Sequence, residues 1–246
     1  MNQFKVIIPS FNSIDYIRRT LSSVEAQNYR NFQAYVIDDG STFPEQREVI
    51  LEFCKRNGWK WHFHDKNYGA LHGMVHALKE WNCDDDDVIC VLDGDDWFSS
   101  PETLQILHKY YSTSDLLLTW GNSEKYPPGH MPMYRAQPVP DMVIDQQLYR
   151  DIPFVFGHLG TFKYFLWRQI KDEDLRDVNG EYFRLLKDKA TMYPMLEMAG
   201  WKVKFIPEVL YIYNMENPLN DYSTADPAEF KRIDQILKQK PKYAVL

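Results

Sequence analysis

Short apolar runs alternate with segments of helical periodicity through the first half of the chain. Residues 6–8 are apolar throughout, which is typical of a strand buried on both faces. Apolar residues then recur every three or four positions over residues 14–24, which predicts an amphipathic helix capped by Asn12 or Ser13. Further strands are predicted over residues 32–37, 59–64, 88–92 and 116–120, and further helices over residues 44–54, 69–81 and 101–111. This alternation predicts an α/β fold with a mostly parallel, Rossmann-like sheet and helices on both faces.

The second half of the chain is less regular. Residues 124–151 contain five prolines, so we expect irregular surface chain there. A helix is predicted over residues 190–199, followed by two strands over 201–206 and 209–213 on either side of Pro207. The last helix is predicted over residues 227–240, with an apolar stripe formed by Phe230, Ile233, Ile236 and Leu237. We expect this stripe to pack on the domain, although its lysine-rich outer face also permits peripheral contact with a membrane surface.

Composition and charge exclude several classes of protein. The chain has 246 residues and a net charge of −7, so its composition gives no sign of nucleic-acid binding, which normally uses a basic face. Its longest apolar run, residues 88–92, is far below the roughly 20 residues that a membrane-spanning helix needs, and the apolar run at the start is too short for a signal peptide. Three cysteines form neither a disulfide framework nor a zinc pattern, which favours reduced thiols and a cytoplasmic location.

Three carboxylates directly follow the most apolar predicted strand. Asp93, Asp95 and Asp96 would repel one another by roughly 4 kcal/mol per pair at about 4 Å and an effective dielectric of about 20. We therefore expect a cation, a shared proton or water among them, and oxygen ligands suit Mg²⁺ or Mn²⁺. A solvated acidic turn is the alternative on spacing alone. An EF-hand is excluded, because Phe98 and Leu104 stand where that loop needs Gly and Glu.

Other catalytic motifs are incomplete or missing from the sequence. His72 and His76 are four residues apart on a predicted helix, but Gly73 stands where a zinc protease has glutamate, so this pair gives little support for a metal site. The chain has no P-loop, no dinucleotide-binding glycine motif and no serine-hydrolase motif. These absences argue against a P-loop enzyme, a dinucleotide oxidoreductase and a serine hydrolase.

Four segments taken together resemble one family. They are residues 6–12 (VIIPSFN), 27–32 (QNYRNF) running into 36–42 (VIDDGST), 67–70 (NYGA) and 92–96 (LDGDD). In this order and spacing they resemble the inverting family 2 glycosyltransferases, which have the GT-A fold. The resemblance implies a nucleotide-sugar-binding half over residues 1–120, a smaller acceptor-binding half over residues 121–225 and a C-terminal helix or tail over residues 226–246.

The resemblance also implies a chemistry and a set of site residues. It implies transfer of a sugar, with Mn²⁺ or Mg²⁺, from a nucleoside diphosphate donor, expected to be a UDP-sugar, to a hydroxyl of a glycan or other acceptor. The residues expected around the nucleotide are Pro9, Ser10 and Phe11 after the first strand, Asp38 and Asp39 after the second, and Asn67 and Gly69 before the third helix. In the D-x-D motif, Asp93 is expected to face the ribose or a metal-bound water, and Asp95 to coordinate the metal.

Inversion by single displacement needs a base on the face opposite the leaving group. Members of the family carry this base just before a helix that ends in glycine, which here selects Asp188, although Lys187 stands where a second acidic residue is usual. Asp188 is alternatively an N-cap, and the fallback candidates are Asp172, Glu173 and Asp174. His158 lies in a segment resembling the acceptor side of some members; it is a candidate for metal or diphosphate contact, or simply a packed histidine.

Two other functions remain open from the sequence. A nucleotidyltransferase on a related scaffold is disfavoured, because residues 10–13 contain no basic residue where such enzymes carry Arg or Lys. A non-catalytic module that binds nucleotide sugars is the second alternative. Residues 213–214 and 217–221, in and beside the polar loop over residues 214–226, resemble a tail found in some family members. This loop is expected either to close over bound donor or to be disordered.

Overall fold

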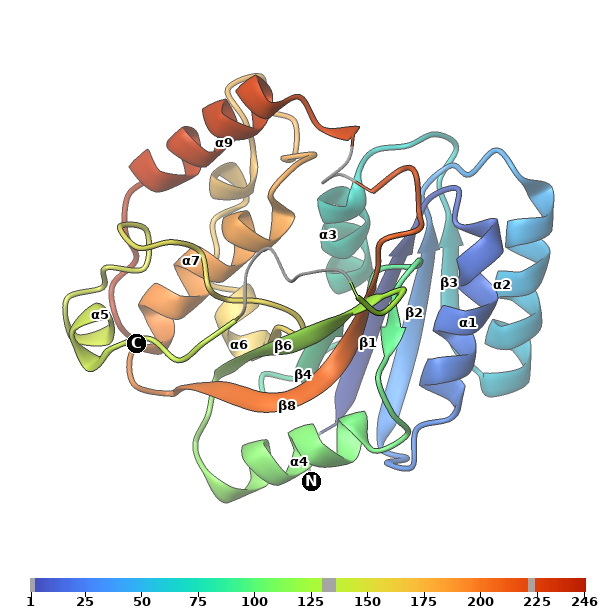
Figure 1. Cartoon of the computed structure of the whole chain (residues 1–246), viewed down its shortest axis with the longest axis horizontal. Coiled ribbons are helices and arrows are strands. Elements are labelled where there is room, and N and C mark those ends of the chain that lie inside the picture. The colour runs from blue at the N-terminus through green and yellow to red at the C-terminus, as the bar shows by residue number, and fades with distance from the viewer. Residues whose placement is uncertain (1–2, 130–135, 221–223) are drawn as a thin grey trace.

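The computed structural model describes residues 3–129, 136–220 and 224–246. Within them, one sheet has the strand order β3-β2-β1-β4-β7-β6-β8-β5 (Figure 1). Its strands are β1 (Phe4–Ser10), β2 (Phe32–Asp38), β3 (Lys60–Phe63), β4 (Val88–Val91), β5 (Trp97–Phe98), β6 (Leu118–Tyr126), β7 (Thr161–Lys163) and β8 (Val203–Asn214). The helices are α1 (Ile14–Glu25), α2 (Pro44–Asn57), α3 (Ala70–Glu80), α4 (Thr103–Thr113), α5 (Asp141–Asp145), α6 (Tyr164–Trp167), the 3₁₀ helix η1 (Asp172–Leu175), α7 (Lys187–Ala199) and α9 (Pro227–Gln239).

The predicted α/β architecture is confirmed. Strands β3, β2, β1 and β4 run parallel, and so do β6 and β8, whereas β7 and β5 pair antiparallel with their neighbours. Every residue of β1 is buried, as a central strand covered on both faces should be. Val6 and Ile8 pack into one apolar cluster with α1, α2 and α4, while Ile7 packs into a second cluster with α3 and α7. Figure 1 shows α1 and α2 on one side of β1 and β2, and α3 on the other.

The predicted break at Pro207 is wrong. A single strand, β8, runs through it and lies along β6 across the molecule (Figure 1). In the β6–β8 register Gly121 pairs with Ile206 and Asn122 pairs with Val209, so Pro207 and Glu208 form an irregularity. Proline has no N–H to give to a ladder, and a bulge is one of the places where a strand tolerates it.

Other differences lie in short elements and boundaries. Strand β6 continues to Tyr126, into the segment predicted as irregular, and β5, β7, α5 and α6 were not predicted. Helix α7 begins at Lys187, three residues before the predicted start. Its N-cap residue is Leu186, so the interpretation of Asp188 as an N-cap is wrong, and Asp188 lies in the first turn.

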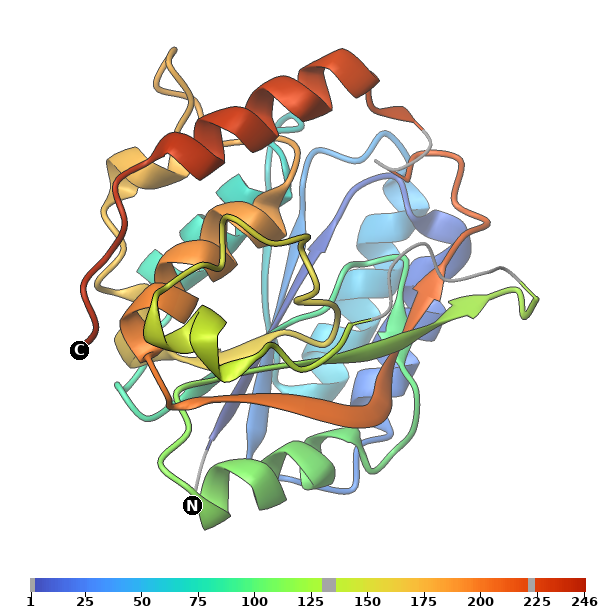
Figure 2. The same ribbon diagram turned by 60° about the vertical axis from the view of Figure 1, so that its left-hand side comes forward.

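The predicted C-terminal helix is confirmed as α9, which packs against α7 (Figure 2). Ile233 and Leu237 of the predicted stripe are buried, whereas Phe230 is exposed. The C-terminal end of α9 is held by Arg150, which pairs with Glu197 of α7 and donates to the carbonyl oxygens of Leu237 and Lys240. No helix in the described part of the chain is both long and apolar enough to cross a bilayer.

Candidate functional site

The carboxyl ends of β1 and β4 meet in close contact. The N–H of Gly94 donates to the carbonyl oxygen of Pro9 at 2.9 Å, next to Ser10 at the end of β1. A Cβ on residue 94 would lie only 2.6 Å from the Cβ of Ser10. Glycine between the two aspartates of the D-x-D motif is therefore required by the close approach of the two strand ends.

Asp96 is a structural member of the acidic group. Its carboxylate is buried and accepts hydrogen bonds from the Tyr211 hydroxyl at 2.5 Å and the Asn214 N–H at 2.7 Å. Burial, together with the charges of Asp95 and Asp93, raises the pKa of Asp96 well above its ordinary value. This carboxyl therefore fastens the end of β4 to β8 and is not available to a ligand.

Asp93 and Asp95 have different partners. Asp93 forms an ion pair with Lys187. Burial works against ionisation of Asp93, but the Lys187 ammonium and His158 outweigh it and hold the pKa of Asp93 below its usual value. Asp95 accepts a hydrogen bond from the Asn217 amide at 2.8 Å, and its pKa is raised by burial and then by the charge of Asp93.

Asp188 lies on the same small pocket as Asp93. This pocket, of about 30 Å³, is also lined by Lys187 and His158. The Nε2 atom of His158 is 3.7 Å from a carboxylate oxygen of Asp188, and its ring stacks on Tyr211 with the ring centroids 4.6 Å apart. The structure thus brings the predicted base, one aspartate of the D-x-D motif and the predicted histidine to one place.

The fallback acids lie elsewhere. Asp172 accepts hydrogen bonds from Arg176 and Lys79, and Asp174 accepts one from the Tyr243 hydroxyl. Asp172 borders a cavity of about 680 Å³, which is lined mainly by α3, α6 and η1. Neither Asp93 nor Asp95 lines that cavity, so its size does not make it the better candidate for metal-dependent chemistry.

Asp38 and Asp39, at the end of β2, differ in their surroundings. Asp38 is fully buried and accepts hydrogen bonds from Gln46 at 2.9 Å and Arg47 at 2.8 Å, which joins β2 to α2. Gln46 also donates to the Ser10 hydroxyl at 2.9 Å. Asp38 therefore helps to hold the carboxyl ends of β1 and β2 together through Gln46. Asp39 instead lies close to the loop that precedes α3.

Asp39 organises the loop before α3. Its carboxylate accepts the backbone N–H groups of Tyr68, at 3.0 Å, and Gly69, at 2.7 Å, and lies 2.7 Å from Nδ1 of His64. Burial opposes its ionisation, but these hydrogen bonds hold the pKa of Asp39 below its ordinary value. Asn67, in the same loop, accepts a hydrogen bond from Arg184.

Three residues around the site were not foreseen as contributors. Lys187 was noted only as a departure from the family pattern, yet it is the cation that pairs with Asp93. Asn217 holds Asp95, and the resemblance of its loop to a tail of some family members was the signal that pointed there. Gln46 had no signal in the sequence, because a single glutamine in a helix carries none. Asp221, in the predicted tail, lies outside the described residues.

The chain matches the model of the family described as glycosyl transferase family 2 over residues 5–170. A protein of Rickettsia bellii described as an uncharacterized glycosyltransferase is 36% identical over 93 residues, which is 38% of this chain and 13% of that protein. Glycosyltransferase GlyG of Streptococcus pneumoniae is 23% identical over 220 residues, which cover 85% of this chain and 69% of that protein.

Solved structures show the same fold. Residues 1–349 of S. aureus TarS, in complex with UDP-GlcNAc, superpose with a TM-score of 0.70 at 19% identity, covering 96% of this chain and 65% of that one. The mannosyltransferase PcManGT from Pyrobaculum calidifontis, in complex with GDP-Man and Mn²⁺, superposes with a TM-score of 0.59 at 15% identity, covering 89% and 58%. The predicted GT-A fold is therefore confirmed, and the chain belongs to glycosyl transferase family 2.

Proposed function

We propose that this protein transfers a sugar, with inversion, from a nucleoside diphosphate donor to a hydroxyl of a glycan or other acceptor. The observation that carries the proposal is the common pocket of Asp93, Asp188 and Lys187, beside the close contact of β1 and β4. The UDP-GlcNAc bound by TarS supports a UDP-sugar as the donor. In this proposal residues 1–120 hold the donor and residues 121–225 hold the acceptor.

The acidic set fits a divalent cation. Asp95 carries a half-buried carboxylate whose pKa is raised by burial and by Asp93, and such a carboxylate is stabilised in its ionised form by a nearby cation. We propose that Asp95 holds Mn²⁺ or Mg²⁺ directly, with Asp93 and His158 as further contacts. When bound, such an ion stabilises the negative charge of the leaving nucleoside diphosphate. The Mn²⁺ in the PcManGT complex supports this choice of metal.

Asp188 is proposed as the base. It lies in the first turn of α7, where the helix dipole favours an anion, and its side chain is 44% exposed. That exposure leaves its carboxylate accessible to an acceptor hydroxyl entering the pocket. His158, 3.7 Å away, is placed to orient it. Asp188 would take the proton of the acceptor hydroxyl as the sugar carbon is attacked.

The chain's own residues would position the nucleotide. Ser10 ends β1 and Phe11 follows it. Asp39 and Asn67 lie at the neighbouring strand end and loop, the edge where ligands bind in open α/β sheets. The polar loop around Asn217 is proposed to reorganise when the donor binds, because it is fastened directly to Asp95. A cytoplasmic location belongs to the same proposal and rests on the cysteine content of the sequence.

Product analysis tests the reaction class. The protein is incubated with Mn²⁺ and a panel of UDP- and GDP-sugars. Where no other acceptor reacts, water accepts the sugar, and the released nucleotide is identified. Release of free nucleoside diphosphate supports glycosyl transfer. Formation of pyrophosphate from a nucleoside triphosphate and a sugar phosphate would instead indicate a nucleotidyltransferase. Binding of UDP and Mn²⁺ without any release from the whole panel would favour a binding module.

Matched variants test the residue roles. Asp188→Asn should reduce kcat by about 10²- to 10⁴-fold, the usual contribution of a general base, while the Kd for UDP with Mn²⁺ stays unchanged. Asp172→Asn is the matched control, because it removes a carboxylate outside the pocket. An unchanged kcat in Asp188→Asn would remove Asp188 from the mechanism. Asp95→Asn should abolish the Mn²⁺ dependence of UDP binding, measured by calorimetry.

A further inference from the structure

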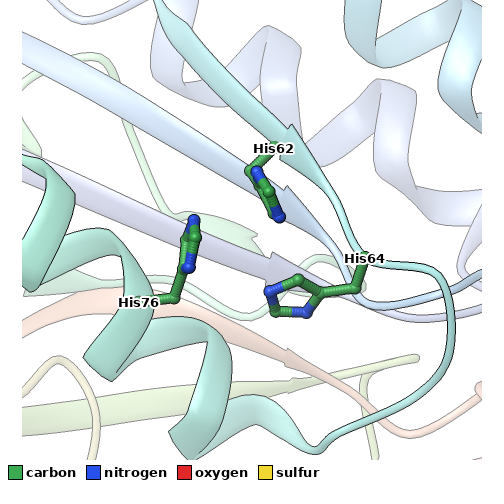
Figure 3. A group of neighbouring side chains, drawn as sticks. All are labelled: His62, His64 and His76. Atoms are coloured by element: carbon green, nitrogen blue, oxygen red, sulfur yellow. The ribbon is translucent and has the colours of Figure 1, made fainter.

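Three histidines come together away from the acidic site (Figure 3). His62 lies on β3, His64 follows the same strand, and His76 lies on α3. Because residues two apart on a strand share a face, His62 and His64 point to the same side, and α3 brings His76 across to them. One ligand nitrogen from each ring lies within 4.8 Å of the other two. Among the described residues, this is the one group of three or more His, Cys, Asp or Glu side chains placed closely enough to hold a metal ion.

Two nitrogen atoms of the cluster lack hydrogen-bond partners among the described residues. Nε2 of His64 and Nε2 of His76 are buried, and neither has a hydrogen-bond partner in the described part of the chain. A buried polar atom left without a partner costs about 1–3 kcal/mol, so two of them side by side need an explanation. An electron-pair acceptor bound to Nε2 of both His64 and His76 would explain why these atoms have no hydrogen-bond partner.

His64 is already oriented as a metal ligand would be. Its Nδ1 lies 2.7 Å from the Asp39 carboxylate, and an ionised carboxylate only accepts hydrogen bonds, so Nδ1 carries the proton. The Nε2 lone pair then faces His62 and His76. Histidines that bind metals typically donate their other N–H to a carboxylate in this way, which fixes the tautomer and raises the basicity of the ligand nitrogen.

The ring positions suit a small cation after a modest adjustment. The ring centroids are 4.1 Å apart for His62 and His76, and 4.8 Å apart for His62 and His64. Tetrahedral Zn–N bonds of about 2.0–2.1 Å place ligand nitrogens roughly 3.3–3.4 Å apart. Nitrogens that lie up to 4.8 Å apart would therefore approach one another by at most about 1.5 Å. His62 is half-buried on the edge strand β3. Burial, and then the neighbouring histidines, lower the pKa of His62 and His76, which favours the neutral rings that bind metals.

We propose that His62, His64 and His76 form a site for Zn²⁺ or a chemically similar transition-metal ion, with Asp39 positioning His64. Three imidazoles with water as a fourth ligand suit zinc, whereas Mg²⁺ and Mn²⁺ prefer oxygen ligands. The site is therefore distinct from the acidic pair Asp93 and Asp95. It joins the edge strand β3 to α3. The pair noted in the sequence, His72 and His76, contributes only one of the three ligands.

Metal binding to untagged protein tests the proposal. After treatment with a chelator and dialysis, the full chain is titrated with Zn²⁺ in competition with a chromophoric chelator, and with Co²⁺ as a probe whose visible spectrum reports tetrahedral coordination. We expect one Zn²⁺ per chain. His62→Gln and His76→Ala should each weaken zinc binding by at least tenfold. Asp39→Asn should weaken it by about 10- to 100-fold, as changes to a residue that orients a ligand typically do.

Two control variants separate this site from others. His108→Gln replaces a histidine that stacks on Tyr29 and lies outside the cluster, so zinc binding should be unchanged. Asp95→Asn should also leave zinc binding unchanged, although it removes the proposed Mn²⁺ ligand. Circular dichroism checks that each variant is folded, and His62→Gln, at a half-buried position, keeps the test available if His76→Ala does not fold. Absence of bound Zn²⁺, equal affinity in His62→Gln and His108→Gln, or loss of zinc only in Asp95→Asn would each overturn the proposal.

Discussion

The Gly94→Ala substitution adds one methyl group where the end of β4 touches the end of β1. The new Cβ would lie 2.6 Å from Cβ, 2.7 Å from Oγ and 2.9 Å from Cα of Ser10, and real Cβ contacts almost never fall below 3.0 Å. Ser10 cannot rotate away freely. Its hydroxyl is hydrogen-bonded to the Ser13 hydroxyl at 2.6 Å and accepts a hydrogen bond from the Gln46 amide at 2.9 Å. Its backbone pairs with that of Asp38 in β2.

The two strand ends must therefore separate in the Gly94→Ala variant. Overpacking of this kind typically costs about 1–3 kcal/mol. For a chain of roughly this size, each kcal/mol lowers Tm by about 2–4 °C, so the expected fall is about 2–12 °C. The same movement displaces Asp93 and Asp95, and the affinity for UDP with Mn²⁺ should fall along with Tm. Thermal unfolding and isothermal titration calorimetry measure the two effects.

Gly121→Ala is the matched control, because its added Cβ would meet only ordinary contacts, the nearest at 3.4 Å. Its Tm and its UDP affinity should stay close to those of the wild type. Equal Tm values within about 1 °C and equal binding of UDP with Mn²⁺ in the two variants would show that the strand ends accommodate the added methyl group. A fall in Tm without a fall in affinity would show that the strand ends separate without moving the aspartates.

Three further outcomes follow from the charged groups. Arg150→Met should lower the free energy of unfolding by about 3–5 kcal/mol in urea, because it leaves Glu197 buried without its cation; adding Glu197→Leu should restore most of the loss. The pKa of Asp172 lies at about 2, chiefly because Arg176 donates a hydrogen bond to its carboxylate. The ionised carboxylate therefore stabilises the fold at pH values above the unfolded pKa of about 3.9. This stabilisation is lost as the pH falls towards about 2. The difference in unfolding free energy between wild type and Asp172→Asn should shrink over that interval, and a constant difference would contradict the assignment. Lys187→Met should raise the pKa of Asp93, seen by NMR titration, because burial is then opposed only by His158; an unmoved pKa would show that the ion pair does not control Asp93.

Patterns that repeat along the chain were enough to predict most of the sheet. The apolar runs of β1, β2 and β4 and the stripes of α1 and α3 lie within a residue or two of their predicted positions, because burial on both faces demands continuous apolar sequence. The strands that were missed, β5 and β7, have two and three residues. Pairing with distant neighbours defines such strands, and no local pattern marks them.

The general location of the candidate site could also be predicted from the sequence. Residues at the ends of predicted parallel strands, such as Asp39 and Asp93, could be expected at one edge, since the carboxyl ends of such strands lie together. The sequence does not reveal which side chains are buried and already hydrogen-bonded within the protein. Asp38 and Asp96 look like Asp39 and Asp95 in the sequence, yet both are buried and fully engaged. The histidine cluster was also hidden, because His62 and His76 meet only through the packing of α3 on β3.

Each carboxylate of the acidic group has a partner within the protein. We expected three neighbouring carboxylates to require an ion, a shared proton or water, but each has a donor from the protein itself: Lys187 for Asp93, Asn217 for Asp95, and the Tyr211 hydroxyl for Asp96. The Lys187 ammonium can neutralise the charge of Asp93 without imposing a coordination geometry, and it can move away from Asp93. If Mn²⁺ and a diphosphate bind at Asp95, the metal ion would compete with Lys187 for Asp93, and the negative charge of the diphosphate would attract the Lys187 ammonium. The residue that breaks the usual acidic pattern before Asp188 would then serve both states of the site, stabilising the empty pocket and neutralising the bound donor.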